Sequence, residues 1–153
     1  MKTLPLEATD QEILDAVREW VNLLVEERYT DAYEFLSHEK SAPGWTPELI
    51  AALIRNYGSP EPGLRGEVFK VTPLDQAKVD PPRFMPLRQE VQRDRDADPF
   101  SFRWDPEGEG DDVGGNIHFD LSLNGYASDL TAIFDFYVVN NHIVFELRDI
   151  RVM

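Results

Sequence analysis

Two consecutive asparagines, Asn140 and Asn141, separate two strongly apolar stretches, residues 130–139 and 142–152. Both central residues of a tight two-residue hairpin turn need a positive φ, which asparagine adopts more readily than most residues that carry a side chain. The two stretches are also rich in valine, isoleucine and phenylalanine, which favour strands. The end of the chain therefore predicts an antiparallel hairpin closed by these two asparagines.

The turn also sets the register of the hairpin. One face then carries three apolar pairs, which are Val138 with Ile143, Phe136 with Phe145, and Phe134 with Leu147. The opposite face pairs Tyr137 with Val144, Asp135 with Glu146, and Ile133 with Arg148. A shift of one residue would divide the phenylalanines between the two faces, so the pattern favours this register. Ile150 is out of phase with Leu147, which predicts a β-bulge at residues 148–149.

Further strands are predicted upstream of the hairpin. Residues 117–123 alternate between apolar and polar side chains, which is typical of a strand with one buried face. Residues 68–71 are a plausible short strand, residues 88–93 alternate weakly, and residues 100–104 alternate well.

Three helices are predicted in the first third of the chain. Thr9 followed by Glu12 forms a capping box, and apolar residues then recur at spacings of three and four from about residue 10 to residue 27. Thr30 is the expected N-cap of a second helix. Thr46 with proline at the next position marks the start of a third helix, and Gly58 its end.

These elements predict one α+β domain spanning residues 1–153, with three N-terminal helices packed on a curved, mostly antiparallel sheet of about four to six strands. The net charge of −14 argues against binding to nucleic acids or anionic membranes, because both need a basic surface. No apolar run is long enough for a membrane span, and no secretory signal is expected at the N-terminus. The absence of cysteine fits a cytoplasmic protein.

The order of three helices and then a long antiparallel sheet resembles the nuclear transport factor two-like (cystatin-like α+β) superfamily. The likeness rests on the first helix, the connection at residues 26–33, and the closing hairpin, whose segments 128–131 and 147–152 are similar to those of small bacterial proteins of this shape. The resemblance implies a cone-like fold with a pocket between the helices and the sheet, where enzymes of the superfamily place Asp, His or Tyr. It also implies sheet-to-sheet homodimers. A generic α+β sandwich has the same order of elements.

Four polar residues are the candidates for chemistry in such a pocket: His118, Asp120, Asp135 and Tyr137. His118 and Asp120 lie two apart on one strand face, where a carboxylate can orient an imidazole and raise its basicity. The competing interpretation is that the polar face of a half-buried strand is simply solvated. Asp135 faces Glu146 across the hairpin, where the two carboxylates could share a proton or a cation. The simpler expectation is relief of the repulsion by Arg148 or solvent.

An acidic, glycine-containing loop is predicted near residue 108, with five carboxylates at Asp105, Glu107, Glu109, Asp111 and Asp112. Its spacing partly matches a calcium-binding EF-hand loop. However, Asn116 replaces the bidentate glutamate, Asp112 occupies a position that is normally apolar, and the flanks are predicted as strands. We therefore expect no metal site and no cofactor.

The distribution of charge suggests a binding function. Residues 104–147 contain nine acids and no lysine or arginine. The favoured hypothesis is a small non-enzymatic interaction module whose acidic face, made by residues 104–147 and including the acidic loop, binds a basic protein partner, as an immunity protein or an accessory factor does. The alternative is a pocket protein of the resembled superfamily, either a ligand binder or a small isomerase, dehydratase or hydrolase. A polar, titratable interior of the cone would favour the alternative, and an apolar, filled interior the interaction module.

Overall fold

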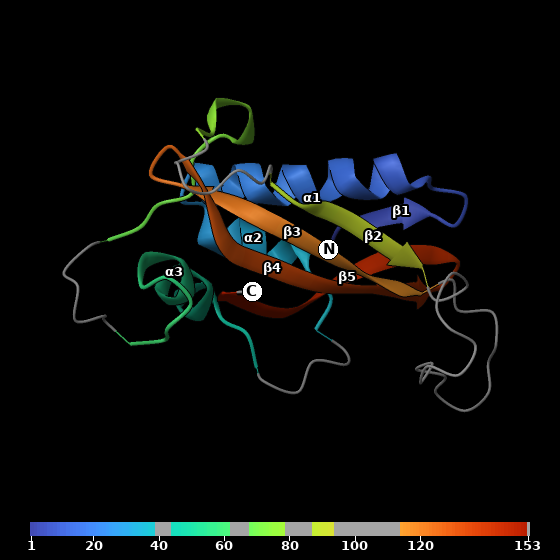
Figure 1. Ribbon diagram of the computed structural model, residues 1–153. Coiled ribbons are helices and arrows are strands. Elements are labelled where there is room, and N and C mark those ends of the chain that lie inside the picture. The colour runs from blue at the N-terminus through green and yellow to red at the C-terminus, as the bar shows by residue number, and fades with distance from the viewer. Residues whose placement is uncertain (39–43, 62–67, 79–86, 94–113, 153) are drawn as a thin grey trace, which may run out of the picture.

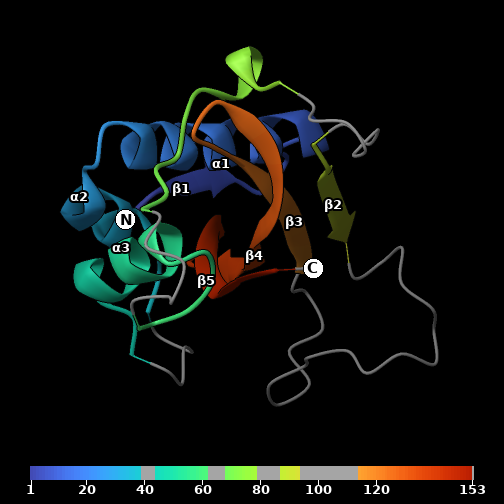
Figure 2. The ribbon, with the colours of Figure 1, turned by 60° about the vertical axis from the view of Figure 1, so that its left-hand side comes forward.

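Five antiparallel strands form one curved sheet in the order β1-β5-β4-β3-β2 (Figures 1 and 2). The structure is a computed structural model that describes residues 1–38, 44–61, 68–78, 87–93 and 114–152. The strands are β1 (Thr3–Pro5), β2 (Gln89–Arg93), β3 (Gly115–Leu123), β4 (Tyr126–Val139) and β5 (His142–Val152). Three helices precede β2 in the chain, which confirms the predicted α+β class with N-terminal helices on a curved antiparallel sheet.

The helices are α1 (Asp10–Val25), α2 (Tyr29–Phe35) and α3 (Pro47–Arg55), and a short 3-10 turn covers Leu74–Gln76. Both predicted threonine caps are confirmed for α1 and α3, since Thr9 forms the capping box and Thr46 accepts the backbone N–H of Leu49. The prediction for α2 is wrong by two residues, because its N-cap is Arg28 and Thr30 lies inside its first turn. The chain reverses sharply at Glu27, which has a φ of 57°. The second helix therefore begins before the position that a cap at Thr30 predicts.

The closing hairpin has the predicted turn and register. Asn140 and Asn141 have φ values of 49° and 62°, and the three predicted apolar pairs are all present. A register shift between Ile133 and Phe134 confirms the predicted bulge. Because of this shift Ile133 faces Asp149, so its predicted pairing with Arg148 is wrong.

A second hairpin joins β3 to β4 through Asn124 and Gly125, both with positive φ. The strand β4 therefore begins at Tyr126, upstream of the predicted start. Opposite Leu121 the ladder is interrupted, and the Ser128 hydroxyl donates to the Leu121 carbonyl at 2.7 Å while accepting the N–H of Leu130. The serine thus replaces the missing backbone hydrogen bond in this bulge.

The remaining strand predictions had mixed outcomes. Residues 88–93 are confirmed as a strand by β2, which covers Gln89–Arg93. Of residues 68–71, only Val71 pairs, as an isolated bridge with Leu123. Residues 100–104 and the acidic loop lie outside the described residues. The short strand β1 was not predicted.

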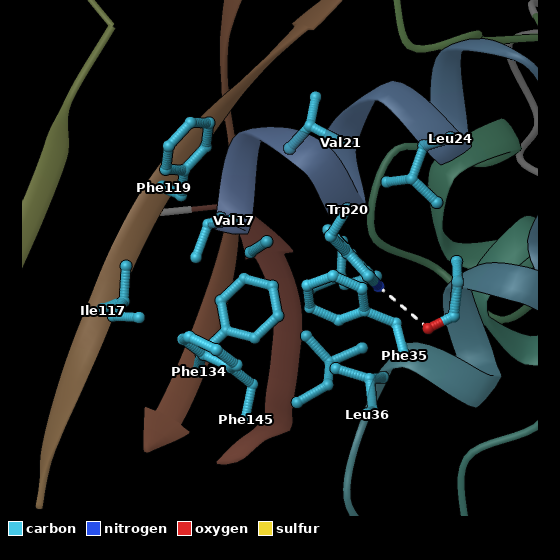
Figure 3. Close-up of a cluster of buried hydrophobic side chains, with 14 of the residues drawn as sticks. Val17, Trp20, Val21, Leu24, Phe35, Leu36, Ile117, Phe119, Phe134 and Phe145 are labelled. Atoms are coloured by element: carbon cyan, nitrogen blue, oxygen red, sulfur yellow. Dashed lines mark hydrogen bonds between the residues drawn. The ribbon is translucent and has the colours of Figure 1, made fainter. Parts of the chain in front are cut away.

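The core lies between α1 and one face of the sheet, which we call the inner face (Figure 3). Its centre is Trp20 of α1, whose ring meets Phe134 of β4 edge-on at a centroid distance of 4.9 Å. The indole N–H donates to the carbonyl of Ala32 at 3.1 Å, which ties α1 to α2. The inner face is completed by residues from three strands: Ile117, Phe119 and Leu121 of β3, Phe136 of β4, and Phe145, Leu147 and Ile150 of β5. Within the described ranges, no helix is both long and apolar enough to cross a membrane.

We expect Phe134→Asp to lower the free energy of unfolding by about 3–5 kcal/mol, because it removes a large buried ring and places a carboxylate against Trp20. The matched control is Val152→Asp at a side chain with 48% exposure, where the same change should cost no more than about 0.5 kcal/mol. Urea unfolding of both variants measures the difference. Equal midpoints would contradict the assignment of the inner face.

Candidate functional site

All four candidate residues lie on the outer face of the sheet, which we define as the face turned away from α1. Residues of β3 and β4 alternate between the two faces, so His118, Asp120, Asp135 and Tyr137 are opposite to the aromatic residues of the core. The inner face at this level consists of packed apolar side chains. The four residues therefore share a sheet face, but that face is not the interior of a cone closed by the helices.

Asp120 is held by a local network. One of its carboxylate oxygens accepts the backbone N–H of Arg88 at 2.8 Å, and the other accepts the Thr131 hydroxyl at 2.7 Å. The guanidinium of Arg88 lies 3.6 Å from the same carboxylate. Asp120 thus joins the segment preceding β2 to β3 and β4, and no hydrogen bond within the described residues links it to His118.

His118 stands between Glu90 of β2 and Ile133 of β4 on neighbouring strands. Burial lowers the pKa of its imidazole, and the positive charge of Arg88 lowers it further, against an opposing effect of Glu90. Arg148 and Arg151 add smaller contributions in the lowering direction. The imidazole is therefore neutral near pH 7, and the nearby charge that acts on it most is cationic.

The two candidates on β4 also have structural partners. Asp135 binds the guanidinium of Arg148 through both carboxylate oxygens, with Nε 3.0 Å from Oδ2, so the expected relief of repulsion by Arg148 is present. Asp135 faces Glu146 as predicted. The hydroxyl of Tyr137 lies 2.5 Å from that of Ser37, and both side chains are buried.

The acids of residues 104–147 that the structure describes do not form an open acidic face. Asp120 and Asp135 are paired with arginines, Asp129 accepts the hydroxyl of Tyr57, and Glu146 is only 6% exposed. The five loop carboxylates at Asp105, Glu107, Glu109, Asp111 and Asp112 lie outside the described residues.

An acidic surface that sequence reasoning missed lies on α1 and α2. Residues 1–38 contain nine acids against three bases, and these acids lie at positions outside the apolar stripe of α1. Five of these acids form ion pairs: Asp10, Asp15, Glu26 and Asp31 with arginines, and Glu19 with Lys2. These acids form the polar side of a helix that the sequence predicts to be amphipathic. They do not form a run free of lysine and arginine, because Arg18 and Arg28 interrupt them.

A buried arginine fixes the end of β2 to the start of α1. The Arg93 side chain is 4% exposed; its Nε donates to Asp10 at 2.7 Å and one terminal nitrogen donates to the carbonyl of Ala8 at 2.6 Å. Arg93 also pairs in register with Gly115 of β3. A side chain at Gly115 would have its Cβ 2.2 Å from the carbonyl oxygen of Gln92, so only glycine fits there.

The part of the chain between β2 and β3 is strongly acidic. Residues 94–113 carry eight acids and two bases, a net charge of −6, and include the predicted acidic loop. Of the described residues that flank it, Arg93 donates to Asp10 and Ala8, and Gly115 pairs with Arg93. The residue that precedes this acidic segment is therefore bonded to the acidic start of α1.

Comparison with protein-family models, curated proteins and solved structures gave no match. Among the described residues, no group of three or more His, Cys, Asp or Glu side chains is arranged to hold a metal ion.

We expect Asp10→Ala to cost about 1.5–3 kcal/mol of stability, since it leaves the buried Arg93 guanidinium without its carboxylate. Asp15→Ala is the matched control on the same helix, because its ion pair with Arg18 is exposed and worth less than about 1 kcal/mol. Chemical denaturation compares the two variants. A larger loss for Asp15→Ala would contradict the proposed role of Arg93 as an anchor.

The lowered pKa of His118 predicts a pH dependence of stability. The unfolded chain, with a histidine pKa near 6.5, binds the proton more readily than the folded protein. This contribution to stability is therefore complete above pH 6.5 and is lost as the pH falls below that value towards the folded-state pKa. We expect His118→Gln to flatten the melting temperature as a function of pH between about 7.5 and about 5. An NMR titration midpoint of His118 above 6.5 would contradict this.

Proposed function

We propose that the protein is a small acidic interaction module that binds a basic protein partner. The observation that carries the proposal is one of charge: residues 94–113 carry a net charge of −6, and Arg93, the described residue that precedes them, binds Asp10 at the acidic start of α1. Acidic groups of one sign gathered at one end of a domain attract an oppositely charged partner and raise the rate of encounter. The loop carboxylates at Asp105, Glu107, Glu109, Asp111 and Asp112 are the proposed contacts.

The packing of the inner face supports a binding role in preference to catalysis. Trp20, Phe134 and their neighbours fill the space that a substrate would occupy in a cone between helices and sheet. Three of the four candidate residues on the outer face, Asp120, Asp135 and Tyr137, form ion pairs or hydrogen bonds with structural neighbours. Because these polar groups are engaged in structural contacts, they support a protein that binds a partner, as an immunity protein or an accessory factor does.

Membership of the nuclear transport factor two-like superfamily, a cytoplasmic location and homodimer formation belong to the same proposal. The order of three helices followed by a curved antiparallel sheet supports the first, and the absence of cysteine supports the second. The third rests on the resemblance.

The test is to capture the partner from native cells with the wild-type chain and then to measure its association rate at two salt concentrations. Neutralising the loop with Asp105→Asn, Glu107→Gln, Glu109→Gln, Asp111→Asn and Asp112→Asn should slow association about tenfold at low salt and flatten its salt dependence.

The matched control removes the same charge elsewhere, at Glu19, Glu26, Glu27, Asp31 and Glu34 of α1, α2 and the connection between them. Its effect on association should be several times smaller, because these residues lie away from the loop anchors. Equal slowing by both variants would show that net charge alone attracts the partner. Unchanged association in the loop variant would contradict the proposal.

A further inference from the structure

The two edges of the sheet differ in how their backbone groups are paired. Along the β5 edge, β1 pairs with His142–Val144 in register, the carbonyl of Phe145 accepts the N–H of Ser37 at 2.6 Å, and the carbonyl of Leu147 accepts the Trp45 indole N–H at 2.7 Å. The opposite edge is β2, and no strand of the described chain pairs with its outer side.

The hydrogen-bonding groups on that outer side can be assigned from the register. The N–H of Asp120 donates to the carbonyl of Arg88 at 2.9 Å, so residues 88, 90 and 92 direct their backbone groups to β3. In an antiparallel ladder the intervening residues direct theirs the other way. The N–H and C=O groups of Gln89, Val91 and Arg93 therefore point away from the sheet.

The surroundings of this edge define what could pair with it. On the inner side, α1 lies along β2, joined at one end by the bond from Arg93 to Asp10 and at the other by the bond from Arg18 to Gln89. Leu14 lies one turn from each of Asp10 and Arg18 on the same helix face, and Val91 lies between Gln89 and Arg93 on the same strand face. Both Leu14 and Val91 are partly buried against the core.

The charge along this edge is negative. Four acids, Asp10, Glu12 and Asp15 of α1 and the exposed Glu90 of β2, lie here against three arginines, Arg18, Arg88 and Arg93. All three arginines have acceptors in the domain: Arg18 donates to Asp15 and Gln89, Arg93 to Asp10 and Ala8, and the guanidinium of Arg88 lies 3.6 Å from Asp120. A strand added at this edge would meet an apolar position beside Val91 and an acidic position beside Glu90.

We propose that the outer edge of β2 binds an extended basic segment of the protein partner as a sixth strand. This inference rests on the proposed function and names how the partner docks. Residues of the segment opposite Val91 are apolar and point toward Leu14, and those opposite Glu90 and Gln92 are lysine or arginine. Main-chain hydrogen bonds to Gln89, Val91 and Arg93 hold the added strand. The alternation of apolar and basic side chains along the segment makes the binding selective for its sequence.

The probe is a nine-residue peptide of alternating valine and lysine with blocked ends. Its matched control is the same peptide with N-methyl groups on alternate backbone nitrogens, which keeps every charge and removes the donors on one edge. With the first peptide, we expect exchange of the Gln89, Val91 and Arg93 amides to slow about tenfold, while those of Glu90 and Gln92, already in the ladder, change little. The methylated peptide should give no such protection.

A variant of the protein tests the same contact from the other side. Val91→Pro removes the outward N–H without removing a bond to β3, as proline does on edge strands, and should abolish peptide protection while leaving the melt cooperative. Glu90→Gln is the charge control and should weaken binding without abolishing it. If the Val91→Pro variant unfolds, the comparison of the two peptides on the wild-type protein still tests the proposal.

The proposal would be overturned if the two peptides bound equally, if neither bound, or if the Val91→Pro variant were still fully protected. It would also be overturned if the peptide gave no protection but the protein formed a dimer that Val91→Pro abolished. That last result would assign the edge to a second copy of the chain. The partner capture with the loop variant judges the proposed function separately, because that variant leaves β2 intact.

Discussion

The packing of Trp20 against Phe134 is the contact on which the fold depends. Phe134 belongs to β4, the central strand of the sheet, which is hydrogen-bonded along both sides to β3 and β5. Trp20 fixes α1 over this strand and, through the carbonyl of Ala32, also fixes α2. Removing this contact would separate the helical layer from the sheet at its centre, where water is most completely excluded.

Strong local periodicity made much of this fold predictable from the sequence. The Asn140-Asn141 turn and the aromatic pairs on one face define the closing hairpin, and threonine caps define α1 and α3. Where prediction failed, a contact distant in sequence decided the outcome. The strand β1 has three residues and exists because β5 provides a template for it. The Asn124-Gly125 turn does carry a local signal, but the bulge at Ser128 disturbs the alternation that follows it.

The candidate site was less predictable for a related physical reason. The alternation of side chains along a strand assigns His118, Asp120, Asp135 and Tyr137 to one face. It does not show which groups of the folded protein bind them. Arg88 and Thr131 reach Asp120 from separate segments, and Ser37 reaches Tyr137 across a hundred residues of chain. Arg93 could not be recognised as buried, because its partners, Asp10 and Ala8, lie more than eighty residues away. Such long-range polar contacts turn apparent catalytic residues into structural ones.

The unequal edges of the sheet limit how this protein can assemble with itself. Polymerisation by edge pairing requires two complementary free edges on each molecule, because every copy must accept one neighbour and donate to the next. Here Ser37, Trp45 and β1 occupy the β5 edge, which leaves β2 as the open one within the described chain. Two copies that meet through β2 satisfy each other around a two-fold axis and present no further edge. Among the described residues, edge pairing through β2 therefore ends at two molecules.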